Sequence, residues 1–376
     1  MAIGDISLGP GSLQFQAGTA TNPSVAFGPT DIAVIAYQDS DLDGQLCTCL
    51  FDSAGNIGAS IIDTWEFDTT FAGLAKIQRI SGNKYACMYY DQAFLIQIFT
   101  FTVLNNGTII KSKIDTETLR QTPGGSNQTG YTNEFRLIAP NTFLFCIVPY
   151  SAIPHKIGKL TISDTGEIDD GPAPSLDFTL QGDAPNSAHV SGPVWVNAYK
   201  DTGGNIQVET HDFSSLIDIY EIDSSGAATG PAISQPQPNR FALAHQGPGN
   251  DGYLKTFTID SDGTITKSVI QEIEHDTEGA YFHRILIIGD GVIAIPYMGY
   301  DEKGWIKTYP IAVDGTIGSL ISSLEYESTR CYSARMLHKG GDIYGIVFSG
   351  TGEIVSLDIE TPGVEFTQHL LMIGVG

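Results

Sequence analysis

Short apolar runs rich in Val, Ile, Tyr and Phe alternate along the chain with turns that contain Gly, Asp and Asn. Each run has roughly four to eight residues, which is the usual length of a β-strand. No stretch of about 12 residues combines apolar positions at helical spacing with capping residues at its ends. The pattern therefore predicts an all-β fold.

A run of small and apolar residues that ends in an aromatic side chain recurs at intervals of roughly 50 residues. The copies end at Tyr37, Tyr90, Tyr150, Tyr199, His245, Tyr297 and Phe348. Roughly 17 residues after most of these positions comes a glycine-containing turn, at Gly55, Gly107, Gly166, Gly263 and Gly315. Such turns predict hairpins, because glycine readily adopts the positive φ of a tight reversal. The nearest such turn after Tyr199 is at Gly226, farther along, which predicts an irregular fourth repeat.

Four strands in a repeat of about 50 residues match a β-propeller blade, and the chain resembles the seven-bladed β-propellers over its full length. It carries neither the Gly-His and Trp-Asp pair of the WD repeat nor a regular kelch double glycine. The resemblance implies one domain over residues 1–376, with four-stranded blades. We expect the N-terminal strand near Ser12–Gly18 to complete the last blade and close the ring. The alternative is that Val364–Leu371 supplies this strand.

Lys and Arg number 19 and Asp and Glu number 43, which gives a net charge of −24. This balance excludes a typical nucleic-acid binder, which needs a basic face toward phosphate. Hydrophobic residues make up 41% of the chain, enough to fill a core and exclude wholesale disorder. No apolar run approaches the roughly 18 residues of a membrane span, and the N-terminus lacks the basic and apolar regions of a signal peptide. We therefore expect cytoplasmic synthesis without a classical export signal and no membrane insertion.

The cysteines are odd in number and lie in apolar runs without a Cys-x-x-Cys pair, at Cys47, Cys49, Cys87, Cys146 and Cys331. This pattern predicts buried thiols in a chain that folds in a reducing compartment.

The recurring aromatic positions are the first candidate ligand contacts. The resemblance to propellers implies that the loops after the second strands lie on one face around the central channel. Two interpretations are open for these residues. They are either core residues that fill the wedge between blades, or a stacking ring for sugars or peptide side chains, formed by Tyr37, Tyr90, Tyr150, Tyr199, His245 and Tyr297.

Positive charge recurs about 13 or 14 residues before these aromatics, on the expected innermost strands, at Lys76, Arg136, Arg284 and Arg335. Cations at equivalent positions would converge on an anion, and Arg geometry suits carboxylate, sulfate or phosphate. Alternatively, each cation pairs with a neighbouring carboxylate such as Glu134 or Asp91.

Asp39, Asp41 and Asp43 precede Gly44 in a D-x-D-x-D-G run, the first half of a calcium loop. An EF-hand is excluded, because its twelfth position is Leu50 and no helix follows. A propeller-type calcium loop and a plain Asp-Gly hairpin turn both remain open. The G-x-G-x-x-G run at Gly247–Gly252 leads into a strand, so it is interpreted as a loop and not as a dinucleotide site.

No H-E-x-x-H, G-x-S-x-G or P-loop sequence is present. His275 and His283 flank one inter-blade loop with Asp276 and Glu278 nearby, which could form an acid/base or metal cluster. A glycosidase would need two carboxylates facing each other; the candidates are Asp91, Asp183, Glu278 and Asp301.

The segment Asp5–Leu13, followed by Gly18 and Thr19, looks like the opening of some tailed-phage virion proteins, in which Leu-Gly-Pro-Gly precedes a β-strand. We expect a non-catalytic recognition or assembly propeller, such as a virion surface or receptor-binding protein. Its expected partner is a glycan or protein ligand, anionic if the cations converge, and neighbouring copies or virion proteins are further partners. A carbohydrate-active hydrolase or lyase acting on an acidic sugar is the second hypothesis. The third is a purely structural subunit with an apolar rim that uses Leu370–Ile373.

Overall fold

The computed structural model describes residues 3–119, 130–149, 156–169, 175–177, 182–212, 214–226, 229–289 and 291–361. Regular structure in these residues is β-strand, with the short 3-10 turn η1 (Pro248–Asn250) as the exception. In this part of the chain, no helix has the length and apolarity needed to cross a membrane. The all-β prediction is confirmed.

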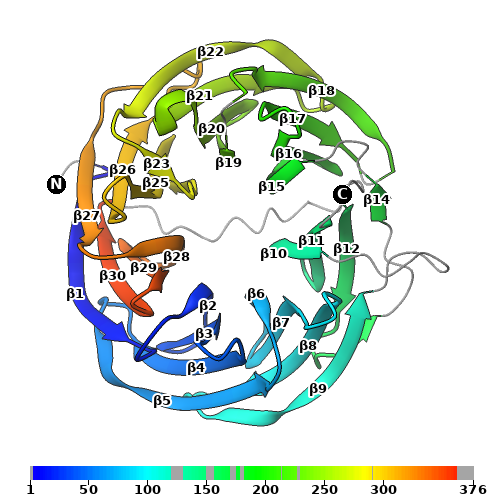
Figure 1. Cartoon of the computed structure of the whole chain (residues 1–376), viewed down its shortest axis with the longest axis vertical. Coiled ribbons are helices and arrows are strands. Elements are labelled where there is room, and N and C mark those ends of the chain that lie inside the picture. The colour runs from blue at the N-terminus through cyan, green and yellow to red at the C-terminus, as the bar shows by residue number, and fades with distance from the viewer. Residues whose placement is uncertain are drawn as a thin grey trace. The chain divides into compact units, whose positions relative to one another are not determined.

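The strands form seven sheets with antiparallel neighbours, labelled in Figure 1. In order across each sheet, the first blade is β2 (Thr21–Phe27), β3 (Ile32–Gln38), β4 (Gly44–Phe51) and β5 (Ile57–Asp68), and the second is β6 (Gly73–Ser81), β7 (Lys84–Tyr90), β8 (Ile96–Val103) and β9 (Ile109–Leu119). The third blade is β10 (Gly130–Ala139), β11 (Thr142–Pro149), β12 (Lys156–Ile162) and β13 (Ile168–Asp169), with β14 (Ser175–Asp177) also paired with β12. The fourth blade is β15 (Gly182–Ser191), β16 (Val194–Asp201), β17 (Ile206–His211) and β18 (Leu216–Asp223).

The fifth blade is β19 (Thr229–Gln237), β20 (Arg240–Gln246), β21 (Gly252–Ile259) and β22 (Ile265–Asp276). In the sixth blade β23 (Ala280–Tyr281) and β24 (Leu286–Gly289) both pair with β25 (Val292–Gly299), which is followed by β26 (Gly304–Pro310) and β27 (Ser322–Glu327). The seventh blade is β28 (Cys331–Gly340), β29 (Ile343–Gly350), β30 (Glu353–Ile359) and β1 (Ile6–Gln14). The prediction of a seven-bladed β-propeller is confirmed.

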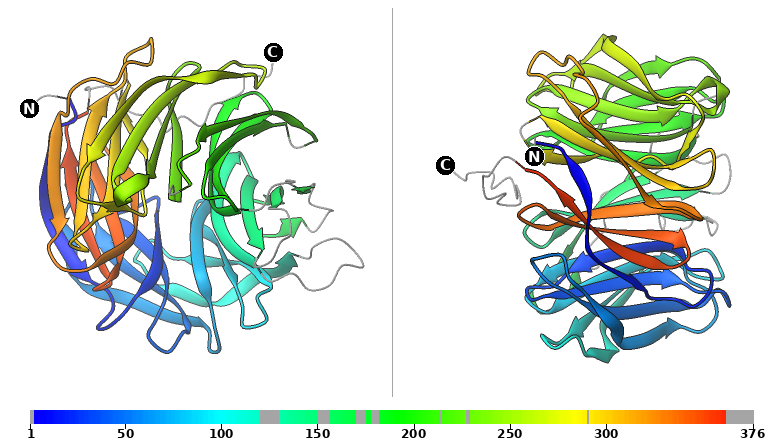
Figure 2. Two further views of the ribbon diagram at one scale, coloured as in Figure 1. Left: turned by 45° about the horizontal axis from the view of Figure 1, so that its top comes forward. Right: turned by 90° about the vertical axis from the view of Figure 1, so that its left-hand side faces the viewer.

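The last blade takes its outermost strand from the other end of the chain. Strand β1 pairs with β30, and the two lie side by side in Figure 2. Pro10 lies in β1, an edge strand, which is where a sheet accepts a residue without a backbone N–H. The prediction that an N-terminal strand completes the last blade is confirmed, with the strand at Ile6–Gln14. The alternative segment Val364–Leu371 lies outside the described residues.

The chain divides into two compact units. Unit 1 contains Phe178–Ala334 together with short segments from both ends of the chain, and unit 2 contains Leu8–Asp177 and Arg335–Leu357. Each unit has its own buried apolar clusters, centred on residues such as Phe241 and Ile295 in unit 1 and Phe99 and Phe51 in unit 2.

The turn glycines build the hairpins between third and fourth strands, as predicted. Gly55, Gly107, Gly166, Gly263 and Gly315 all have φ between 83° and 93°, the region that glycine adopts without steric cost. The prediction for the fourth blade is corrected. Its hairpin turn is the segment between β17 and β18, where Asp212 accepts backbone hydrogen bonds from Ser214 and Ser215. Gly226 follows β18, so this blade has four regular strands and an Asp in place of the turn glycine.

Neighbouring blades are joined by one recurring hydrogen bond within each unit. A threonine hydroxyl on the third strand of one blade donates to the carbonyl of the turn glycine of the next blade. The pairs are Thr48–Gly107 and Thr100–Gly166 in unit 2, and Thr210–Gly263 and Thr256–Gly315 in unit 1. Since each donor is buried, the loss of one bond would leave a polar group without water. The turn glycine therefore serves both its own hairpin and the packing of the preceding blade.

A β-bulge recurs near the start of the first strand. In five blades one residue at the bulge has positive φ: Asn22 (49°), Leu74 (50°), Gly230 (56°), Phe282 (57°) and Ser333 (49°). The residue before it pairs with the second strand at Thr21–Gln38, Gly73–Tyr90, Thr229–Gln246 and Tyr281–Met298. Bulges of this kind redirect side chains and are common next to functional sites.

Candidate functional site

The recurring aromatic residues that the structure describes lie at the ends of second strands, as predicted, and they are buried. Of the six candidate contacts, Tyr37, Tyr90, Tyr199, His245 and Tyr297 have exposed fractions of 8% or less, and Tyr150 lies outside the described residues. Burial at this level favours the interpretation as wedge-filling core residues over that of a stacking ring.

In the second blade the sequence pattern predicted the wrong residue, Tyr90, for the aromatic position of the second strand. Tyr89, not Tyr90, is the equivalent of Tyr37, because each lies two residues before the Asp that opens the next loop, Asp91 or Asp39. Successive residues of a strand point to opposite faces. Tyr90 accordingly packs against Phe71 and Phe94, away from the position that Tyr89 occupies.

The equivalent residues contact the end of the preceding blade's outer strand. Tyr89 donates to Asp68 Oδ2 at 3.0 Å and Tyr297 donates to Asp276 Oδ2 at 2.7 Å. Tyr37 makes the same contact with Gln16, at 3.3 Å. In each case the partner precedes the tyrosine by 21 residues. We call these contacts inter-blade ties; the repeat pattern did not predict their partners, which are Asp68, Asp276 and Gln16.

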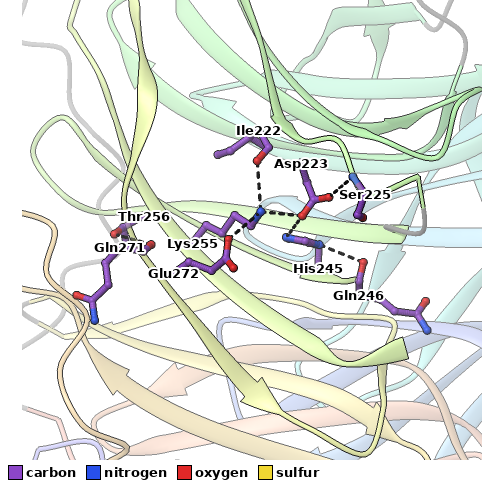
Figure 3. Close-up of polar contacts among 9 residues, drawn as sticks. All are labelled: Ile222, Asp223, Ser225, His245, Gln246, Lys255, Thr256, Gln271 and Glu272. Atoms are coloured by element: carbon purple, nitrogen blue, oxygen red, sulfur yellow. Dashed lines mark hydrogen bonds and ion pairs between the residues drawn. The ribbon is translucent and has the colours of Figure 1, made fainter. Parts of the chain in front are cut away.

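In the fifth blade the tie is charged, as Figure 3 shows. Lys255 Nζ lies 2.7 Å from Asp223 Oδ2 and 3.0 Å from Glu272 Oε2, and it donates to the Ile222 carbonyl at 3.3 Å. His245 Nε2 lies 3.6 Å from the same Asp223 oxygen. Burial raises the pKa of Asp223, but the hydrogen bonds from Lys255 and Ser225 outweigh it and lower this pKa to about 2. Asp223 therefore stays ionised and holds the lysine.

The sixth blade repeats this arrangement. Lys307 Nζ lies 3.0 Å from Asp276 Oδ2 and donates to the His275 carbonyl at 2.6 Å. Burial and the hydrogen bond to Asp276 raise the pKa of Tyr297 far above its usual value, so its hydroxyl remains the donor. Asp276 thus accepts from a tyrosine and a lysine at once.

Two buried histidines lie beside this tie. His275 Nε2 and His283 Nε2 are 3.2 Å apart, so one ring donates to the other. Neither Nδ1 has a hydrogen-bond partner among the described residues. Burial lowers both pKa values, that of His275 to about 3. Within the described residues no group of three or more His, Cys, Asp or Glu side chains could hold a metal ion.

Glu209 occupies the third-strand position of Lys255 and Lys307 in the fourth blade. It accepts a hydrogen bond from Tyr199 at 3.2 Å, and its exposed fraction is 1%. Burial raises its pKa to about 7, against the smaller opposing effect of the tyrosine. A carboxyl group that binds a proton near neutral pH has the property of a general acid, but here it is enclosed.

The predicted cations lie at or near first strands. Lys76 is in β6, Arg136 in β10 and Arg335 in β28, while Arg284 lies between β23 and β24 and donates to the His283 carbonyl at 3.1 Å. Lys76 is buried. Arg284 belongs to unit 1 and the other three cations to unit 2. An anion site built from them stays a prediction.

The Asp39 carboxylate binds its own loop. Oδ1 accepts from the backbone N–H of Asp41 and Asp43, and Oδ2 accepts from Gln45 Nε2, each at 3.0 Å. Asp91 and Asp201 make the same bonds in their loops, ending on Gln97 and Gln207. This repetition favours the hairpin-turn interpretation, and calcium binding at Asp39, Asp41 and Asp43 stays a prediction.

A shallow depression of about 400 Å³ lies in unit 2, lined by Asp68, Thr70, Asp91, Gln92 and Ala93. Its carboxylates are engaged, Asp68 by Thr70 and Tyr89 and Asp91 by its loop. Of the other carboxylates considered for catalysis, Glu278 is exposed, Asp301 pairs with Lys303 at 3.3 Å, and the side chain of Asp183 lies outside the described residues.

The exposed aromatic residues are different from those predicted. Tyr300, in the loop after β25, is 70% exposed, and Phe282, at the bulge after β23, is 46% exposed. Phe282 meets Tyr332 edge to face at 6.2 Å, and the Arg330 guanidinium lies 4.9 Å from the centre of the Tyr332 ring. Arg330 also pairs with Glu302 at 3.3 Å. We call Phe282, Tyr300, Arg330 and Tyr332 the aromatic patch. Alignment of the bulge positions across repeats would have revealed Phe282 where other blades have Asn, Leu, Gly or Ser.

No protein-family profile and no curated protein sequence matches the chain. Solved structures with similar folds include the WD40 domain of Toxoplasma gondii coronin, at a TM-score of 0.59 and 10% identity, covering 96% of this chain and 89% of that one. A putative 6-phosphogluconolactonase from Bacteroides fragilis has a TM-score of 0.59 and 13% identity, covering 81% and 84%. A periplasmic gluconolactonase from Pseudomonas aeruginosa has a TM-score of 0.59 and 12% identity, covering 88% of each chain. These similarities show the fold, a β-propeller, which hosts unrelated functions.

Proposed function

We propose that this protein is a non-catalytic recognition propeller that binds a partner through the aromatic patch of unit 1. The observation that carries this proposal is the exposure of Phe282 and Tyr300, with Phe282 in contact with Tyr332 and the Arg330 guanidinium over the Tyr332 ring. Tyr and Arg, with other aromatic residues, are the residue types that dominate binding energy at interfaces. Loops held by a rigid sheet scaffold are also the usual place for binding residues.

The engagement of the buried charges supports binding over catalysis. Asp223, Asp276 and Asp68 accept hydrogen bonds from side chains of the next blade. Glu209, whose pKa suits acid catalysis, is enclosed by the sheet. These groups stabilise the packing of one blade on the next, so the proposed binding residues are those exposed at the surface. We also propose attachment to a virion, from the resemblance of Leu8–Gly11, and binding of an anionic glycan, from the cations at Lys76, Arg136, Arg284 and Arg335.

The test is a binding screen of the purified full chain against a glycan array and a peptide array, with and without EDTA. We expect selective, saturable binding that Tyr300→Ser weakens and that leaves the ligand chemically unchanged by mass spectrometry. Turnover of a bound sugar or lactone would overturn the non-catalytic proposal in favour of a hydrolase. Binding to no probe would favour a structural subunit. Loss of anionic-glycan binding in Arg335→Ala would support the anion site, and sensitivity to EDTA would support the calcium loop.

A further inference from the structure

Phe282 occupies a backbone position that disfavours bulky side chains. Its φ is 57°, in the left-handed region, where a residue with a large side chain is a strained outlier. At the equivalent bulge position other blades carry Asn22, Gly230 and Ser333, which are small or polar. Asn and Gly are the residues that tolerate this conformation best.

The Phe282 ring packs against no buried cluster of the described residues, unlike the other bulky residue at this bulge position. Leu74 is the other bulky residue at this position, and it packs against the buried cluster that contains Phe135 and Phe143. Phe282 instead has 46% of its surface exposed. The protein therefore holds an apolar ring in water on a strained backbone, and strain of this kind gathers at functional positions.

The surroundings of Phe282 are suited to a cation. The Tyr332 ring beside it already has the Arg330 guanidinium 4.9 Å from its centre, which is a cation–π contact within the chain. Exposed carboxylates are close by: Glu302 pairs with Arg330, Asp301 is the next residue to Tyr300, and Glu278 adjoins Gly279. A Cβ on Gly279 would lie 3.1 Å from Tyr300 Cβ, so the loops of Glu278 and Tyr300 touch.

Resting on the proposed recognition function, we propose that the aromatic patch binds Lys or Arg side chains presented by a basic segment of a partner protein. The exposed faces of Phe282 and Tyr300 would take the cationic head groups, and the exposed carboxylate of Glu278 would pair with one of them. The net charge of −24 attracts such a partner at long range and speeds its association. Exposed rings supply the apolar contact area that a purely acidic surface lacks.

Phe282→Asn is the decisive variant, because it relieves backbone strain, removes the ring and leaves the charge unchanged. Val313→Asn is the matched control, since Val313 is a 76% exposed apolar residue in a loop of the same unit. The probes are peptides of equal length in which Lys and Arg are replaced stepwise by Gln, with a panel of neutral and anionic glycans alongside. Binding is measured at two salt concentrations, and thermal midpoints are measured for every variant.

We expect peptide binding to increase with Lys and Arg content, to fall at least tenfold in Phe282→Asn, and to persist in Val313→Asn. The thermal midpoint of Phe282→Asn should stay level or rise by about 2 °C. A midpoint that falls by several degrees would make Phe282 a packing residue and overturn the proposal. Basic-peptide binding that both variants retain would be attraction by net charge alone and would also overturn it. Glycan binding lost in Phe282→Asn would keep the recognition function but replace its cationic ligand with a sugar, whereas binding to no probe would overturn the recognition function itself.

Discussion

The hydroxyl of Tyr297, on a second strand, donates a 2.7 Å hydrogen bond to Asp276, the last residue of the preceding blade's outer strand. Tyr89 and Asp68 repeat this relationship in the other unit, at the same separation of 21 residues. The contact links two blades through groups that are largely shielded from water, so it is a specific polar element within an apolar wedge.

Removal of the Tyr297 hydroxyl should destabilise the protein. Tyr297→Phe leaves the ring in place but deprives Asp276 of one donor, and we expect a loss of about 1.5–3 kcal/mol, typical of hydrogen bonds to charged groups. Urea unfolding followed by fluorescence measures this change. Tyr309→Phe is the control, since Tyr309 is also buried but its hydroxyl has no hydrogen-bond partner in the described part of the chain. Equal effects from both substitutions would contradict a stabilising tie.

Lys255 is expected to matter far more than an exposed lysine in a similar ion pair. Lys255→Met leaves the Asp223 carboxylate without its main partner in a site with little water, which should cost about 3–5 kcal/mol. Lys267→Met removes an exposed ion pair with Asp218 and should cost less than about 1 kcal/mol. The urea midpoints of the two variants test the difference. A Lys255→Met protein as stable as the wild type would show that Asp223 finds water or another cation.

Glu209 should make the protein less stable as the pH rises. Its pKa is about 7 in the folded chain, above the usual value of 4.5, so the folded state binds more protons than the unfolded state between these values. Stability is therefore full below about pH 4.5 and falls by roughly 3 kcal/mol as the pH passes 7. Glu209→Gln should remove this decline, whereas Glu167→Gln, at an exposed turn, should not. Urea midpoints from pH 4.5 to 8 distinguish the two.

The histidine pair should produce the opposite dependence. Burial lowers the pKa values of His275 and His283, so the unfolded chain takes up protons that the folded chain excludes. Stability from this pair is full above about pH 6.5 and is lost as the pH falls toward the lowered values. A His275→Gln, His283→Gln double variant should flatten the slope of stability between pH 6.5 and 4, while His338→Gln should leave it unchanged. An unaltered slope in the double variant would mean that the pair is already protonated in the fold.

Gly11 should be essential for the strand that completes the last blade. A Cβ at this position would lie 2.5 Å from the backbone nitrogen of Ile57, and Gly11 exchanges 3.1 Å hydrogen bonds with the Ser356 hydroxyl. Backbone atoms cannot move aside as a flexible side chain can, so Gly11→Ala should cost about 1–3 kcal/mol. Ser12→Ala, in the same strand as Gly11, is the control. Gly82→Ala is unsuitable as a control because Gly82 has positive φ. Faster proteolysis of the N-terminal segment in Gly11→Ala alone would support the prediction, and equal proteolysis of both variants would oppose it.

The repeat period predicted the number of blades and the position of each second strand. It did so because each blade repeats the same local elements: apolar strands and a hairpin turn that needs positive φ at residues such as Gly107 and Gly263. The N-terminal strand was predicted by the same logic, since the last repeat lacked a fourth strand. The blade count and the second strands depend on residues close together in the chain, whereas β1 pairs with a strand at the other end of it.

The candidate site depended on contacts that periodicity does not contain. A slip of one residue placed Tyr90 where Tyr89 belongs, and alternation along a strand then sends the side chain to the other face. The aromatic residues at strand ends proved buried, while the exposed rings, Phe282 and Tyr300, lie outside the repeated pattern.

The sequence by itself determined the fold class and the blade count, because hydrophobic period and turn chemistry are local properties. It left two candidates for the strand that closes the last blade, and the tertiary structure pairs β1 with β30. The tertiary structure alone decided which charges are engaged and which rings are exposed. The ion pair of Lys255 with Asp223 and the meeting of Phe282 with Tyr332 each join residues of different blades. Their partners are set by how one sheet packs on the next, and burial sets the energy of each contact once the sheets have met.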